Sequence, residues 1–162
     1  MNSMVPTTFL IRKSTAQDAR AISACMSSAF ATYRDQYTPD AYAQTVLSTE
    51  LVRDRMAQME LFVAVSEGAI VGTLAFGVGN HEGHLRGMAV LPEWQGTGVA
   101  SALLQSAEEA MRVRGCERVV LGTTEPLARA IRFYQRHGFY STGRVCEFFG
   151  MRLYELCKCL SA

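Results

Sequence analysis

The sequence has almost no net charge and no long apolar run, and its cysteines are odd in number, so they cannot form a full set of disulfides. Its 16 Lys and Arg residues stand against 15 Asp and Glu residues, so nothing indicates a nucleic-acid or anionic-membrane surface. No apolar run approaches the ~20 residues that cross a bilayer, and the first residues lack the pattern of a secretory signal. Five cysteines are an odd number for a disulfide framework, which favours free thiols in a reducing, cytoplasmic setting.

The sequence does have the composition of one folded domain. Its 162 residues are 49% hydrophobic and 19% charged, which is ordinary for a globular chain and argues against disorder. This length suits one domain with a sizeable core, so we expect a single domain over residues 1–162.

Apolar periodicity and turn residues predict where the helices and strands lie. The expected helices are 16–31, 38–59 with a break near 48–49, 99–114 and 126–136. The expected strands are 7–13, 61–65, 70–78, 84–91, 118–122, 139–145 and 151–158. This order predicts a mixed α/β (α+β) fold, with about four helices and a mostly antiparallel sheet of about seven strands.

A glycine-rich loop joins the predicted strand 84–91 to the predicted helix 99–114. It contains Gln95-Gly96-Thr97-Gly98-Val99-Ala100. Glycines let the backbone approach a ligand, and N–H groups at a helix N-terminus bind phosphate oxygens. A lone Gly-x-Gly is a weak signal of ligand binding. The alternative is that these glycines only turn the chain from the strand to the helix.

Two known phosphate-binding loops can be compared with this segment. A P-loop needs Lys followed by Ser or Thr after its second glycine, where this chain has Val99-Ala100. A dinucleotide fingerprint is nearer, although Ser101 stands where its last glycine belongs. Its acidic residue belongs at the end of the next strand, whereas Glu117 stands at the beginning. A nicotinamide-dependent oxidoreductase is therefore kept as an alternative function.

Two motifs in the second half of the chain occur together and in order. The first is Gln95-x-x-Gly98-x-Ala100, preceded by Met88-Ala89-Val90-x-Pro92, and the second runs from Ala130-Ile131-Arg132-Phe133-Tyr134 to Gly138-Phe139. The first resembles the Gln/Arg-x-x-Gly-x-Gly/Ala motif of the GNAT superfamily of N-acetyltransferases. The second resembles the Ala-x-x-Phe-Tyr-x-x-x-Gly-Phe segment of the same superfamily.

The resemblance implies the GNAT fold, with its fourth and fifth strands parallel and splayed around the cofactor. It implies transfer of an acetyl group from acetyl-CoA, without a metal, to a primary amine of a small molecule or peptide. A non-catalytic domain that binds acyl-CoA as a regulator is a second alternative. No nucleic-acid or membrane partner is expected, and a homodimer is left open.

The resemblance also assigns positions to the cofactor. The loop amides would hold the pyrophosphate, and the strand before them would pair with the pantetheine arm. The implied cofactor-binding residues are Met88, Ala89, Val90, Gln95, Gly96, Thr97, Gly98, Val99, Ala100, Ser101, Ala130 and Tyr134. One departure is Leu127, which stands where the family often has an asparagine that bonds to pantetheine.

Two residues are candidates for proton transfer. Tyr134 matches the family position that protonates the departing thiolate, and a phenol is a suitable donor at pH 7; simple packing in the core is its alternative. Strand alternation from Val90 predicts that His84 shares the face of Val90. Several family members have a glutamate at this position as the base, and imidazole can do the same work. Glu82 and Glu125 are the reserves, and His84 as a plain polar strand-end residue is equally consistent.

The resemblance places acceptor specificity between the first two helices and in the last hairpin. Tyr33, Tyr37 and Phe148 are the candidate substrate-binding residues there, with ordinary packing as the alternative for each. Cys157-x-Cys159 lacks a second Cys or His pair that would complete a four-ligand metal site, so no metal is expected.

Overall fold

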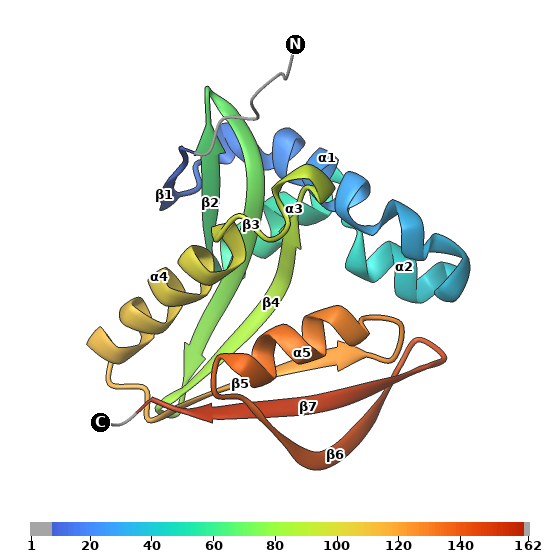
Figure 1. The fold of residues 1–162 in the computed structure, drawn as a ribbon, viewed down its shortest axis with the longest axis vertical. Helices are drawn as coiled ribbons and strands as arrows, with labels where there is room; N and C mark the ends of the chain where they lie inside the picture. The colour runs from blue at the N-terminus through green and yellow to red at the C-terminus, as the bar shows by residue number, and fades with distance from the viewer. Residues whose placement is uncertain (1–7, 161–162) are drawn as a thin grey trace.

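A computed structural model describes residues 8–160. These residues form one seven-stranded sheet of order β1-β2-β3-β4-β5-β7-β6 (Figure 1). The strands are β1 Leu10–Lys13, β2 Glu60–Ser66, β3 Ala69–Gly79, β4 Glu82–Val90, β5 Arg118–Thr124, β6 Tyr140–Phe148 and β7 Met151–Cys159. The helices are α1 Ala19–Phe30, α2 Pro39–Thr45, α3 Thr49–Gln58, α4 Val99–Val113 and α5 Ala128–Arg136, with short 3-10 turns η1 Ala16–Asp18, η2 Ala31–Gln36 and η3 Pro92–Trp94.

The predicted mixed fold with seven strands is confirmed. The predicted helix 38–59 is two helices, because both Thr38 and Ser48 act as N-caps. The Thr38 hydroxyl accepts a hydrogen bond from the Ala41 amide, and the Ser48 hydroxyl accepts one from the Leu51 amide. Each cap starts its own helix at the break that the sequence allowed near 48–49. Thr7, where the first strand was expected to begin, lies outside the described residues.

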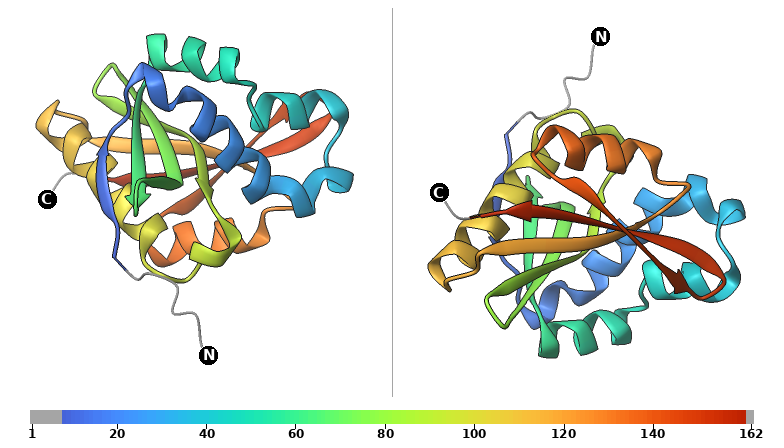
Figure 2. Two further views of the ribbon diagram at one scale, coloured as in Figure 1. Left: turned by 90° about the horizontal axis from the view of Figure 1, so that it is seen from above. Right: turned by 90° about the horizontal axis from the view of Figure 1, so that it is seen from below.

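Helices cover both faces of the sheet (Figure 2). On one face α1 and α3 enclose a cluster that includes Ile22, Val63 and Ala75. On the other face α4 packs on the strands through a second cluster that includes Leu74 and Leu103. The sheet is therefore the middle layer of three, with an apolar cluster on each side.

Strands β4 and β5 are parallel but stay paired for only part of their length. The pairs run from Glu82↔Arg118 to Leu85↔Leu121, which confirms the predicted parallel pairing. Beyond Leu85, β4 continues beside β3, and β5 continues beside β7 as far as Thr124. The two strands therefore separate in the middle of the sheet.

A β-bulge interrupts β4 close to this separation. Thr73 pairs with Ala89 but Ala75 pairs with Arg86, so one residue of β3 opposes two residues of β4. This extra residue corrects the prediction that His84 shares the face of Val90. His84 pairs with Gly77, on the face covered by α1 and α3, whereas Val90 pairs with Gly72, on the face covered by α4.

Gly87 allows the bulge to form. Its φ is +68°, and a Cβ there would lie 2.7 Å from Nη1 of Arg55. We expect Gly87→Ala to lower the free energy of unfolding by about 1–3 kcal/mol, because both the backbone and the arginine must shift. Gly79→Ala is the matched control, since Gly79 has an ordinary φ and open space. Urea unfolding of the two variants measures the difference, and equal losses would show that the bulge does not require glycine.

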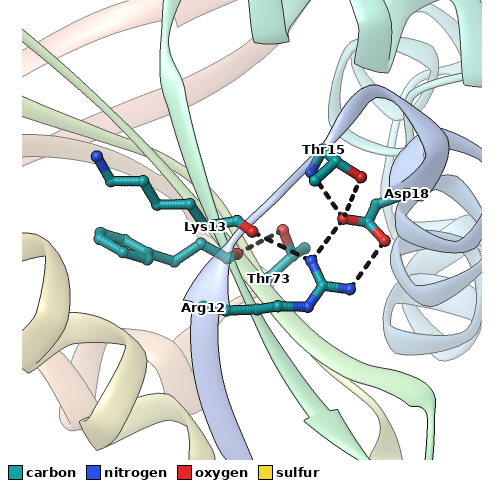
Figure 3. Close-up of polar contacts among 6 residues, drawn as sticks. Arg12, Lys13, Thr15, Asp18 and Thr73 are labelled. Carbon is teal, nitrogen blue, oxygen red and sulfur yellow. Dashed lines mark hydrogen bonds and ion pairs between the residues drawn. The ribbon is translucent and has the colours of Figure 1, made fainter.

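The first turn after β1 is fixed by a capping network (Figure 3). Arg12 donates two hydrogen bonds to the Asp18 carboxylate, at 2.7 and 3.0 Å, and the Thr15 amide donates a third at 2.7 Å. The hydrogen bond from Arg12 is the largest cause that lowers the pKa of Asp18 to about 2. A depressed carboxyl pKa stabilises the fold at neutral pH, and this contribution is lost as the pH falls towards that value.

Candidate active site

The separation of β4 from β5 opens a cleft of about 1040 Å³. Its walls include the end of β4, the glycine-rich loop, α5, η2 and the β6–β7 hairpin. The candidate residues that line it are His84, Met88, Ala89, Val90, Gln95, Gly96, Gly98, Ala100, Ser101, Ala130, Tyr134, Tyr33, Tyr37 and Phe148. Thr97 and Val99 are outside this lining. The Val99 side chain is fully buried, and the Thr97 hydroxyl donates to the Trp94 carbonyl.

The glycine-rich loop presents open backbone at the start of α4. Gly96 and Gly98 have φ values of +79° and +92°, and no atom lies within 4 Å of where a Cβ would be on either. Gly98 is the N-cap of the 15-residue α4, whose first N–H groups have no partner within the helix. These free amides and the positive end of the helix dipole fit the phosphate groups of a nucleotide cofactor.

The Gln95 side chain links the glycine-rich loop to β4 and to α5. Its side-chain amide donates to the Val90 carbonyl at 3.4 Å, and its Oε1 accepts a hydrogen bond from Nη1 of Arg129 on α5 at 2.9 Å. The Arg129 guanidinium therefore lies beside the loop and adds a positive charge to the same wall.

The end of β4 has a strand edge without a strand partner. From Arg86 to Val90, no described strand pairs with β4 on the side that faces β5. Peptide groups on such an edge can pair with an extended chain that carries amides of its own. The edge therefore fits the amide-containing pantetheine arm that the sequence resemblance implies.

Tyr134 enters the cleft from α5. The residue is 6% exposed, and its ring contacts Phe133 and Phe139 edge-on at centroid distances of 5.3 and 5.4 Å. Burial raises the pKa of Tyr134 above its ordinary value, so the phenol keeps its proton at neutral pH. Its hydroxyl makes no hydrogen bond to another residue between 8 and 160, and it is therefore available as a donor.

His84 lies across the sheet from the loop, beside Glu82. The His84 Nε2 is 3.4 Å from one Glu82 oxygen, and the other oxygen accepts a hydrogen bond from Arg118 at 2.5 Å. The His84 side chain is half exposed and lines the cleft with Glu82. Glu125, the other reserve base, is outside the cleft lining.

The candidate substrate-binding residues come together at the cleft from opposite ends of the chain. The Tyr37 hydroxyl shares a 2.6 Å hydrogen bond with Thr124 at the end of β5. Next to it, the Thr38 hydroxyl donates to the Phe149 carbonyl at 2.6 Å and joins α2 to the β6–β7 hairpin. The Tyr37 hydroxyl is therefore engaged within the protein, while Tyr33 and Phe148 present side chains to the same cleft.

The structure adds lining residues that the sequence pattern did not single out. Thr123 is 4% exposed and lines the cleft, and its hydroxyl has no partner among the described residues. Arg55 and Arg86 line it too. A glycine inside a strand pattern is a known sign of a bulge. Gly87 was therefore the signal that could have predicted the bulge, and with it the face of the sheet on which Arg86 lies.

A comparison with protein families supplies the remaining observation. Residues 23–139, which include the loop, β4, β5 and α5, match the model of the acetyltransferase (GNAT) family. The chain belongs to the GNAT family. The glycine-rich loop and Tyr134 thus lie in one matched region.

Individual relatives agree with the GNAT assignment. The chain is 33% identical over 101 residues to an N-alpha-acetyltransferase MAK3 of Arabidopsis thaliana, in an alignment that covers 59% of this chain and 53% of that protein. The chain thus spans about half the length of this curated relative.

Solved structures share the fold over almost the whole GNAT domain. The ribosomal-protein-S18-alanine N-acetyltransferase of Escherichia coli has a TM-score of 0.78 at 18% identity, with 96% of each chain covered. The PaiA N-acetyltransferase of Thermoplasma acidophilum, solved with coenzyme A, has a TM-score of 0.78 at 17% identity, with 94% of this chain and 99% of that chain covered. Between residues 8 and 160, no helix has the length and apolar character to cross a membrane.

Proposed function

We propose that this GNAT domain is an acetyl-CoA-dependent N-acetyltransferase that acts on primary amines. The observation that carries the proposal is the meeting of three features in one cleft. These are the open amides of the loop, the free edge of β4 and the Tyr134 hydroxyl. When bound, acetyl-CoA supplies the acetyl group as a thioester.

The residues on the α4 side would hold and activate this group. Of the loop from Gln95 to Ala100, the amides of Gln95 and Thr97 donate to the Pro92 and Trp94 carbonyls, and the remaining amides hold the pyrophosphate. Met88 and Val90 offer backbone groups to the pantetheine amides. A backbone N–H of this edge donates to the carbonyl oxygen as negative charge develops on it. Tyr134 donates its proton to the sulfur that leaves, and its raised pKa keeps that proton in place until then.

The residues on the opposite face would receive the amine. His84 takes a proton from the incoming ammonium, directly or through one water, and Tyr33 and Phe148 contact the rest of the acceptor. Peptide N-terminal amines are the acceptor class that the relatives support, since two of them are named for N-alpha-acetylation and for acetylation of an alanine. Small primary amines are the second acceptor class.

Binding distinguishes the proposal from a nicotinamide-dependent oxidoreductase. Acetyl-CoA should raise the Tm in proportion to the logarithm of its concentration over Kd. NAD should have little effect, because it lacks the pantetheine arm that fits the β4 edge. Thermal unfolding with each ligand measures this, and a larger shift with NAD would overturn the assignment.

Turnover distinguishes the proposal from a regulatory acyl-CoA-binding domain. A screen of peptides and small amines, with release of free thiol as the readout, should find at least one acceptor that increases the rate above hydrolysis. Binding of acetyl-CoA without any such acceptor would favour the regulatory alternative.

His84 gives a prediction about removal of the acceptor's proton. With one acceptor, His84→Ala should lower kcat/KM, and His84→Glu should retain part of the rate, because a carboxylate can also take the proton. The control is His81→Ala, because His81 lies in the β3–β4 turn and outside the cleft lining. An unchanged kcat/KM in His84→Ala would assign the base to Glu82, Glu125 or water.

A further inference from the structure

Two of the arginines that line the cleft, Arg55 and Arg86, lie beside the free β4 edge. Arg55 comes from α3 and Arg86 from β4, and both line the cleft on the face covered by α1 and α3. Neither forms an ion pair or a side-chain hydrogen bond with any residue from 8 to 160. Outside the cleft lining, Arg12, Arg114 and Arg118 each have a carboxylate partner. The other arginines of the lining, Arg129, Arg136 and Arg144, come from α5 and β6 and also form no ion pair among the described residues.

The bulge of β4 fixes where Arg55 lies. Its Nη1 sits 2.7 Å from the position of a Cβ on Gly87, and its Cζ sits 3.9 Å from the same point. The guanidinium therefore covers the backbone next to the free β4 edge. Burial and the nearby charge of Arg86 both lower the pKa of Arg55 from its ordinary value, which indicates two cations held close together.

The acids of the same cleft are already engaged. Glu82 interacts with Arg118 and His84, and Glu155 accepts a hydrogen bond from Thr142. Two guanidinium groups without a counter-ion repel each other, and the partial burial of Arg55 strengthens that repulsion. An arrangement of this kind is favourable when a ligand brings the missing negative charge.

We propose that Arg55 and Arg86 bind a carboxylate of the acceptor, so that this site prefers amines that carry an acidic group. The inference rests on the proposed function. Arg86 lies two residues from His84 on the same strand face, a separation of about 6.6 Å along a strand. An acidic group several bonds from the amine fits this spacing, as in a peptide whose second residue is Glu, or in a small linear aminocarboxylate.

Matched acceptors test the preference. One pair of peptides differs only in Glu or Gln as the second residue, and a small pair consists of 4-aminobutyrate and its amide. We expect kcat/KM to be roughly 10-fold higher or more for the acid in at least one pair, because a bond between charged groups is stronger than a neutral one. If the acid is preferred in the peptide pair, the carboxylate belongs to a peptide side chain; if it is preferred in the small pair, the carboxylate belongs to a small amine.

Variants assign the preference to these arginines. Arg55→Gln and Arg86→Gln should each reduce the ratio of kcat/KM for the acid over the amide, while Arg53→Gln should not, because Arg53 is exposed on the same helix and outside the cleft lining. Arg86→Glu should shift the preference towards a peptide with Lys as the second residue. This reversal cannot follow from a loss of folding.

The outcomes separate this inference from the proposed function. Acetylation of acid and amide acceptors at equal rates by the wild-type protein would overturn the arginine assignment and leave the transferase proposal standing. A preference that Arg55→Gln and Arg86→Gln both retain would also overturn it. If no amine in either pair or in the wider screen is acetylated, the proposed function itself fails.

Discussion

Tyr134→Phe is expected to lower kcat for acetyl transfer by ~10- to 100-fold with little change in folding stability. The substitution keeps the ring that packs between Phe133 and Phe139 and removes only the hydroxyl. Because that hydroxyl has no other partner within the described residues, its loss leaves no buried group unpaired. The proton is needed only as the thiolate leaves, so the effect should appear in kcat and less in KM.

Steady-state kinetics with one acceptor measure this effect. Tyr140→Phe is the control, since Tyr140 is 52% exposed on β6 and outside the cleft lining. A raised KM with unchanged kcat would mean that Tyr134 serves only in binding or packing. Equal losses in both variants would mean that the hydroxyl of Tyr134 has no special role.

Gly98→Glu is expected to abolish the stabilisation of the protein by acetyl-CoA. At a ligand concentration of 100 times Kd, the wild-type protein should gain about 2.7 kcal/mol of stability. In the variant, a carboxylate would occupy the open space at the N-cap of α4 and repel phosphate where the helix dipole now attracts it.

A second glycine separates this effect from backbone strain. Gly115 also has a positive φ, of +79°, and open space around it, but it lies at the other end of α4. Gly115→Glu should therefore cost comparable backbone strain and keep the full acetyl-CoA shift in thermal unfolding. Retention of the shift in Gly98→Glu would place the phosphates elsewhere.

Local signals in the sequence account for most of the fold. The N-caps at Thr38 and Ser48 act within a few residues of themselves, and so does the glycine pair that opens α4. Such short-range effects can be predicted from neighbouring residue types. The parallel, separating strands β4 and β5 came instead from the family resemblance, because no local pattern specifies which strands become neighbours.

The bulge shows where simple alternation fails. Assigning side chains to faces by strict alternation from Val90 is correct only for a regular strand. The extra residue at the Gly87 bulge moves His84 to the opposite face. The correction places His84 on the face of Arg86, away from the loop that fits the cofactor. The proposed base and the proposed proton donor thus belong to different sides of the sheet, and both line the same cleft.

Contacts between distant segments could not be predicted. Arg55 meets the bulge from α3, and Tyr37 meets Thr124 across 87 positions of the chain. Leu127, which replaces the usual asparagine of the family, packs against the cluster formed by α1 and α3. Its apolar role there depends on tertiary packing, which a pattern of neighbouring residues does not reveal.

Product analysis under one set of conditions tests the central claim most directly. The protein is incubated with acetyl-CoA and the best amine of the screen, and mass spectrometry quantifies the acetylated amine and free CoA in the same sample. We expect equal amounts of the two products, with both reduced to the uncatalysed level in Gly98→Glu. Free CoA without acetylated amine, or equal yields from the protein and the Gly98→Glu variant, would contradict acetyl transfer in this cleft.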